Sequence, residues 1–167
     1  AIKLANDLID NFQNIYEHKW LNMMRDKLGL FGEVKNDKKL INDLLDWMEK
    51  NKVDYTNTFC YLMDIYSDDV YKNPDFLNWM NNWKKRSALN NFNKEKQINL
   101  MKKNNPTVIP RNYKVEEALA DANKGDLGKL KKLLSILKKP YDGKNNIKEF
   151  QLPGQTGNKK YQTFCGT

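Results

Sequence analysis

Apolar residues recur at every third or fourth position along most of this chain, and no stretch alternates apolar and polar residues as a half-buried strand does. Such spacing places the apolar side chains on one face of a helix, so the pattern predicts an all-α protein. About seven helices are expected, near residues 2–28, 38–51, 55–66, 74–90, 93–104, 111–124 and 127–139. With 167 residues, the chain can build a multi-helix bundle over residues 1–140 around one core, or two small subdomains.

Several expected helices carry start or stop signals in the sequence. Gly29 follows the first helix and predicts its end, because glycine readily adopts the left-handed conformation of a helix C-terminus. Asp37 is expected to cap the second helix, Asp54 or Thr56 the third, and Asn73 the fourth. These side chains would accept hydrogen bonds from free backbone N–H groups in the first turn.

The fourth helix carries an aromatic stripe next to a basic run. Phe76, Trp79, Met80 and Trp83 recur at helical spacing, and "KKR" follows them at residues 84–86. Aromatic rings beside cations can stack on nucleic-acid bases. An apolar stripe at this spacing is typical of a helix face that packs into a core, and we favour that interpretation.

Residues that could carry catalysis are scarce. The chain has two cysteines, Cys60 and Cys165, and one histidine, His18, and their spacing matches no zinc-binding motif. No Ser-His-Asp arrangement that could use the single histidine is evident. The sequence contains no Gly-rich phosphate loop. We therefore predict no catalytic and no metal-binding residue within this chain. Cys60 lies inside an expected helix and is predicted to be buried as a small apolar side chain.

The basic charge lies in the second half of the chain. Residues 1–83 hold 10 Lys and Arg against 14 Asp and Glu, whereas residues 84–167 hold 19 against 7. A basic half can bind nucleic acid, an anionic membrane or an acidic partner, or it can be a solvated helical face. The helix pair over 111–139 resembles the spacing of a DNA-reading motif, but its lysines and leucines fit ordinary amphipathicity. A free-standing nucleic-acid-binding module is the alternative function, and we do not favour it.

Residues 141–167 lose the helical periodicity and are predicted to form an irregular tail. Such a tail is either disordered or anchored to a folded surface by its aromatic residues, including Phe150, Tyr161 and Phe164, and we favour the second. No apolar run approaches the roughly 20 residues that span a bilayer, and the first 20 residues lack a signal-peptide pattern. We expect no membrane partner and a cytoplasmic location in a bacterium.

The stretch "NNPTVIPRNYKVEEALADANKGDLGKLKKLLSILKKPYD" resembles the C-terminal signature of the selenoprotein O family, also called YdiU-like proteins. "MMRDKLGL", "FLNWMNNWKKR" and the ending "FCGT" are also similar to segments of that family, in the same order. The signature positions that we take as a structural motif are Asn105, Pro106, Arg111, Asn112, Gly125 and Asp126.

The resemblance implies a protein-kinase-like (pseudokinase) fold that transfers AMP from ATP to hydroxyl groups of protein substrates, with Mg or Mn as the metal. In the family, the catalytic parts precede the region that resembles this chain, and none of them appears here. ATP and the metal are therefore expected in a missing core, which would be the partner of this chain. Since the chain begins at Ala1 inside an expected helix, we interpret it as a C-terminal fragment.

The resemblance also suggests roles for individual residues. Arg111 would satisfy carbonyl groups at the junction between the fifth and sixth helices, or pair with a carboxylate, and Asn112 would cap the sixth helix. Cys165 would be a redox-active thiol that forms a reversible disulfide. Its partner would be a cysteine of the missing core or Cys60, and we favour the core. An inert surface thiol is the alternative for Cys165.

Overall fold

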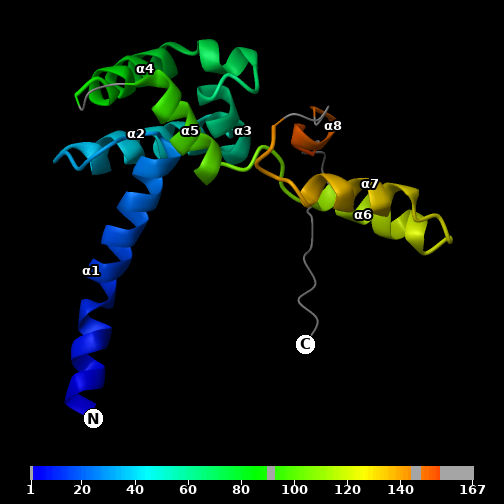
Figure 1. Cartoon of the computed structure of the whole chain (residues 1–167), viewed down its shortest axis with the longest axis horizontal. Coiled ribbons are helices and arrows are strands. Elements are labelled where there is room, and N and C mark those ends of the chain that lie inside the picture. Colours follow the sequence, from blue (N-terminus) through cyan, green and yellow to red (C-terminus); the bar gives the residue numbers. More distant parts are fainter. Residues whose placement is uncertain (1, 90–92, 144–147, 155–167) are drawn as a thin grey trace. The chain divides into compact units, whose positions relative to one another are not determined.

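The computed structural model describes residues 2–89, 93–143 and 148–154, and these residues form eight α-helices and one short 3-10 helix (Figure 1). In chain order the elements are α1 (Ile2–Lys27), α2 (Asp37–Lys50), α3 (Tyr55–Leu62), η1 (Asp69–Lys72), α4 (Pro74–Ser87), α5 (Lys94–Asn104), α6 (Asn112–Ala122), α7 (Gly128–Leu137) and α8 (Lys148–Gln151). The described residues contain no β-strand, so the predicted all-α class is confirmed.

The structure differs from the expected helices in a few places. The third helix ends at Leu62 rather than near residue 66, because Asp64 takes a positive φ of 60° and turns the chain. The sequence did not predict η1, which is one turn long. It also placed Lys148–Gln151 in an irregular tail, whereas these residues form the single turn α8. Tyr161, Phe164 and Cys165 lie outside the described residues.

The described chain divides into two compact units. Of the described residues, unit 1 comprises 2–89, 93–107 and 140–143, and unit 2 comprises 108–139 and 148–154. Unit 1 therefore contains α1 to α5 with η1, and unit 2 contains α6 to α8. The chain leaves unit 1 once and returns to it, so unit 2 is built from two separate stretches of sequence.

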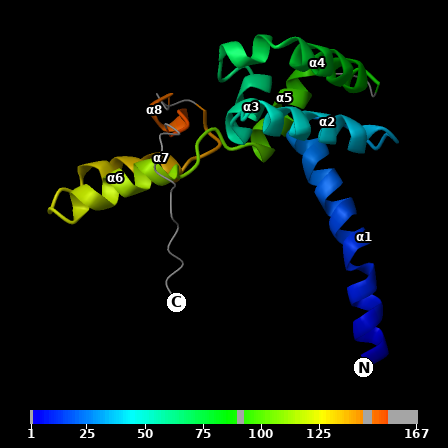
Figure 2. The ribbon, with the colours of Figure 1, turned by 180° about the vertical axis from the view of Figure 1, so that it is seen from behind.

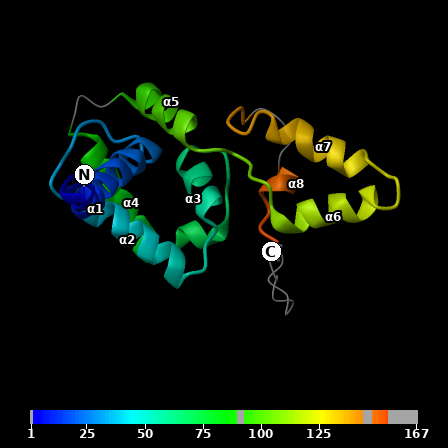
Figure 3. The same cartoon turned by 90° about the horizontal axis from the view of Figure 1, so that it is seen from below.

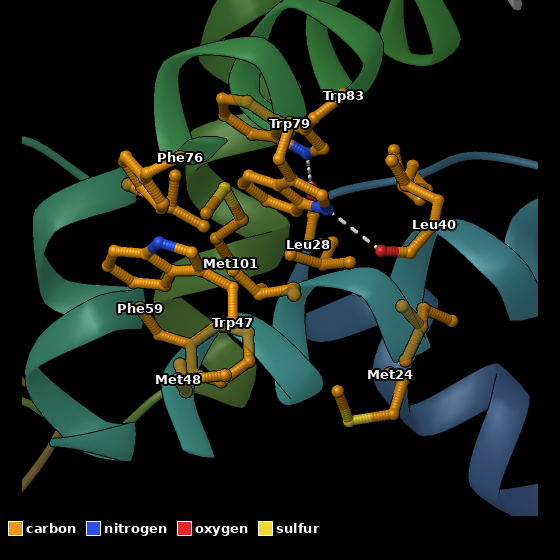
Figure 4. Packing of buried hydrophobic residues seen from close by; sticks show 14 of the residues in the cluster. Met24, Leu28, Leu40, Trp47, Met48, Phe59, Phe76, Trp79, Trp83 and Met101 are labelled. Atoms are coloured by element: carbon orange, nitrogen blue, oxygen red, sulfur yellow. Dashed lines mark hydrogen bonds between the residues drawn. The ribbon is translucent and has the colours of Figure 1, made fainter. Parts of the chain in front are cut away.

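Unit 1 is built around a cluster of large aromatic and aliphatic side chains from all five of its α-helices and η1 (Figure 4). The aromatic stripe of α4 faces this core, with Phe76, Trp79 and Trp83 exposed by 8% or less. The two indole N–H groups donate to backbone carbonyls, Trp79 to Leu40 at 2.8 Å and Trp83 to Leu28 at 2.9 Å. Because buried donors are costly when unpaired, these bonds allow the indoles to be buried. The predicted core role of the stripe is confirmed.

The helix signals of unit 1 are mostly those that the sequence predicted. Asp54 caps α3 by accepting from the Asn57 N–H at 2.8 Å, and Asn73 caps α4 by accepting from the Asp75 N–H at 2.9 Å. Gly29 ends α1 with a φ of +64°. A Cβ atom at Gly29 would lie 2.5 Å from the Cγ atom of Gln97, so both the conformation and the close approach of α5 require glycine.

Unit 2 is a helical hairpin with a small core. Figure 3 shows α6 and α7 side by side and antiparallel, joined by a short turn at Gly125, which has a φ of +90°. Ala118 from α6, Leu133 from α7 and Phe150 from α8 form its buried cluster. Phe150 is 4% exposed, so this predicted anchor of the tail packs on the hairpin.

In the described part of the chain, no helix combines the length and the apolar character that crossing a bilayer requires.

Candidate functional site

The signature residue Asn105 lies at the end of α5 and joins it to the end of α1. Its side chain is 1% exposed. The amide nitrogen donates to the carbonyls of Lys27 at 2.8 Å and Met101 at 2.9 Å, and Oδ1 accepts from Lys27 Nζ at 3.0 Å. Both polar ends of the amide are thus bonded to the protein. An amide used in this way fixes how two helix ends meet, because an apolar residue there would leave these groups unpaired.

Lys27 completes this junction from the last turn of α1. Its Nζ also donates to the carbonyl of Asn104 at 3.1 Å, and it lies 4.8 Å from the ring centre of Phe59 and 5.5 Å from that of Tyr55. Carbonyl oxygens and aromatic faces both stabilise an ammonium group. Burial lowers the pKa of the Lys27 amine, and the charge of the nearby Cys60 group in its ionised form opposes that shift.

Cys60 is 0% exposed, as the sequence predicted. Its Sγ lies 3.8 Å from the carbonyl oxygen of Pro106 and 4.0 Å from that of Thr107, so α3 contacts the segment that follows Asn105. A buried thiol among carbonyls and aromatic rings is inert until the structure opens. Cys165 lies outside the described residues, so its disulfide stays a prediction.

A buried ionic cluster around Asp37 joins three helices of unit 1. Asp37 Oδ2 accepts from Arg25 Nε at 2.8 Å, from the Val34 N–H at 3.0 Å and from Arg86 Nη2 at 3.1 Å. Arg86 Nε donates to Oδ1 of the same carboxylate, and Arg86 Nη2 also donates to the Gly32 carbonyl at 2.9 Å. The carboxylate therefore fixes the loop between α1 and α2 against α4.

The sequence did not reveal this cluster, and its prediction for Asp37 was wrong. Asn36 occupies the cap position of α2 and makes no capping bond, while Asp37 is the first helical residue and is 1% exposed. Burial alone would raise the pKa of the Asp37 carboxyl. Hydrogen bonds from Arg86, from the Val34 amide and from Arg25, with the charge of Arg86, outweigh burial and hold that pKa below its ordinary value.

The signature residues that follow Pro106 lie in unit 2. Arg111 occupies the cap position of α6 without capping it through its side chain, and Asn112 is the first helical residue, so Asn112 is not the predicted cap. Arg111 Nη2 donates to the Gln151 carbonyl at 3.0 Å. Arg111 thus bonds a carbonyl of α8. This bond ties the start of the hairpin to the segment that carries Phe150. The expected bonds of Arg111 to carbonyl groups at the junction between α5 and α6 stay a prediction.

Gly125 and Asp126 form the turn of the hairpin. Gly125 lies in the turn that follows α6 and has a positive φ of 90°. Asp126 Oδ1 accepts from the Gly128 N–H at 2.8 Å, although Leu127 is the residue at the cap position of α7. The carboxylate thus bonds a free N–H at the start of α7, one residue earlier in the chain than a regular cap.

Basic side chains of unit 2 are partly neutralised by acidic neighbours. Lys132 Nζ lies 2.8 Å from Glu149, Lys114 Nζ lies 3.3 Å from the same carboxylate, and Lys129 Nζ lies 2.9 Å from Asp121. Such exposed pairs contribute little to stability, but they reduce the positive field of the helix pair. They weaken the case that this face evolved to hold a phosphate backbone.

Two features of the described residues concern the binding of a metal or a nucleotide. Among them, no group of three or more His, Cys, Asp or Glu side chains is placed to hold a metal ion. An open hollow of about 320 Å³ lies along α1, and its polar lining includes His18, Arg25 and Glu33. Arg25 is already bound to Asp37 and Glu33, and the lining contains no glycine whose backbone N–H groups could cradle phosphates.

Comparison with known proteins defines the class of this helical chain. Three relatives that are each called a protein nucleotidyltransferase YdiU match all of it: those of Pelagibacter ubique at 53% identity, Nitrosococcus oceani at 41% and Bacillus mycoides at 42%. Residues 2–138 match the family described as protein adenylyltransferase SelO. The chain belongs to this family. It covers only 34–35% of the length of these three relatives, which is about a third.

Proposed function

We propose that this chain is the C-terminal helical part of a SelO-like protein adenylyltransferase. The longer protein would transfer AMP from ATP to hydroxyl groups of protein substrates in the cytoplasm, with Mg or Mn bound in its pseudokinase core. The observation that carries the proposal is the 53% identity to a YdiU protein over the whole chain. Within this chain, we assign no residue to the chemical step.

The role that we propose for this region is to support the catalytic core. Two of the signature residues help to fix the internal geometry of the units. Asn105 bonds the ends of α1 and α5 in unit 1, and Arg111 bonds α8 at the start of the hairpin in unit 2. Residues that hold a scaffold in shape can preserve the position of a distant active site without touching substrate.

The AMP-transfer proposal is tested with ATP labelled on its α-phosphate. We expect the full-length protein to label protein hydroxyls in the presence of Mg or Mn, and the 167-residue chain alone to transfer no label. Transfer by the isolated chain would show that catalysis does not require the core. A full-length protein that hydrolyses or binds ATP without labelling protein would contradict AMP transfer.

We further propose that Cys165 is a regulatory thiol whose disulfide partner lies in the core. Two features support this choice. Cys60, the other cysteine of the chain, is fully buried, and Lys159 and Lys160 lie close to Cys165 in sequence, where positive charge favours the thiolate.

The test compares full-length protein with its Cys165→Ser variant under reducing and oxidising conditions. Oxidation is expected to change the AMP-transfer rate of the unmodified protein and to leave the variant unaffected. Cys60→Ser is the matched control, and it should respond to oxidation like the unmodified protein. Equal responses of the unmodified protein and Cys165→Ser would remove the redox role.

A further inference from the structure

The first half of α1 presents an apolar stripe to solvent. Ile9, Phe12 and Tyr16 follow the spacing of one helix face and are 70%, 64% and 59% exposed. The rings of Phe12 and Tyr16 are stacked, with their centres 6.2 Å apart. We call these three residues the α1 stripe. Single exposed apolar residues are common on protein surfaces, whereas a row of large ones along one helix face indicates a binding surface.

The α1 stripe continues a face that is buried further along the same helix. Trp20 and Met24 lie on this face one and two turns after Tyr16, and both pack in the core of unit 1. Figure 2 shows the second half of α1 beside α2 and α5, and the first half extending away from the other helices of unit 1. This face is therefore packed on the core of unit 1 at Trp20 and Met24, although Met23 is still 44% exposed, and it is uncovered at the α1 stripe.

We propose that the α1 stripe packs against an apolar surface of the core of the longer protein, and this rests on the proposed function. The chain spans about a third of its relatives, so a large part of such a protein is available to cover the stripe. The partner would present aliphatic or aromatic side chains, because the α1 stripe offers rings and an isoleucine for contact.

The size of the α1 stripe favours a partner within the same chain over a second copy. A stable interface between separate molecules buries at least about 1,000 Å². Each of the three side chains offers at most roughly 150–250 Å², and only 59–70% of it is exposed. Two copies that meet through the stripe would therefore bury roughly 600–1,000 Å² in total, which at best reaches that threshold. A covalently connected partner is held at an effective concentration in the millimolar range, so a small patch suffices.

Hydrogen exchange at the backbone amides of residues 9–16 tests the proposal in the 167-residue chain and in the full-length protein. We expect these amides to exchange at least about 100-fold more slowly in the full-length protein, because covering the stripe suppresses local opening of the helix. In the full-length protein, Phe12→Asp should remove most of this protection. Leu77→Asp changes another exposed apolar residue of unit 1, at 43% exposure, and should leave the protection unchanged.

The possible outcomes separate this proposal from its alternatives. Equal exchange rates in the two proteins would overturn it, and so would protection that survives Phe12→Asp. Protection in the 167-residue chain that rises with protein concentration would instead assign the stripe to a second copy. Exchange does not depend on AMP transfer, so an inactive but protected full-length protein would contradict the proposed activity and leave this inference standing.

Discussion

The two units are both helical, but they are stabilised in different ways. In the described residues, unit 1 buries a cluster of seventeen apolar side chains together with an ionic group at Asp37. The corresponding cluster of unit 2 has three buried residues, and one of them, Phe150, comes from a separate stretch of sequence. Burial of apolar area is the main favourable contribution to folding. We therefore expect unit 1 to fold as a stable body and unit 2 to be marginal.

The distribution of tryptophan allows the two units to be followed separately. All four tryptophans of the chain, Trp20, Trp47, Trp79 and Trp83, belong to unit 1. Tryptophan fluorescence therefore reports the unfolding of unit 1, while far-UV circular dichroism reports the helices of both units. If unit 2 is less stable than unit 1, the circular dichroism signal should begin to fall at a lower denaturant concentration than the one at which the fluorescence changes.

The largest effect is expected from Asp37→Ala. The substitution leaves Arg25 and Arg86 buried without their shared carboxylate, and breaking a buried ion pair costs about 3–5 kcal/mol. The fluorescence midpoint in urea should shift strongly. Asp43→Ala is the control, because the Asp43 pair with Lys39 is exposed and should contribute below about 1 kcal/mol. Similar shifts for both variants would mean that the cluster does not stabilise unit 1.

The next effect is expected from Phe150→Ala in unit 2. Phe150 is a major part of the small core there, and removing a buried phenylalanine costs about 3 kcal/mol or more. In Phe150→Ala, the early fall in circular dichroism, which reports unit 2, should occur at a lower urea concentration. The fluorescence transition, which reports unit 1, should keep its midpoint. Leu152→Ala is the control, since Leu152 is 54% exposed. A fluorescence transition that moved with Phe150→Ala would show that the two units unfold as one.

The smallest effect is expected from a pair of glycines. Gly29→Ala forces a side chain into a positive φ and against Gln97 and Met101, and should cost about 2 kcal/mol in unit 1. Gly125 also has a positive φ, but no atom lies within 4 Å of the Cβ that alanine would add there. Gly125→Ala should therefore lower the stability of unit 2 by about 1 kcal/mol. Urea unfolding of each variant measures both values. Equal costs would indicate that conformation alone requires glycine at Gly29.

Features that depend on neighbouring residues were predictable from the sequence. Helical periodicity predicted the fold class, the burial of Cys60 and the inward face of α4, because each depends on spacing within one helix. The Asp54 and Asn73 caps were also predictable, since a capping side chain bonds N–H groups two or three residues ahead.

Features that depend on distant partners were not predictable in this way. Asp37 looked like a helix cap, but Arg86, 49 residues away, determines its position. Arg111 bonds a carbonyl 40 residues away, in a turn that sequence periodicity could not reveal. Periodicity places Ile9, Phe12 and Tyr16 on one face of α1, but it does not show where the packing of that face within unit 1 ends.

The hydrogen bonds of Thr107 have a consequence for the evolution of this chain. Both its backbone N–H and its hydroxyl group donate to the carbonyl of Pro140, at 2.7 and 2.9 Å. The segment 108–139 therefore leaves and rejoins unit 1 at one point, where Thr107 is hydrogen-bonded to Pro140. A segment whose two ends lie side by side can be lengthened, shortened or replaced during evolution without changing the fold of unit 1.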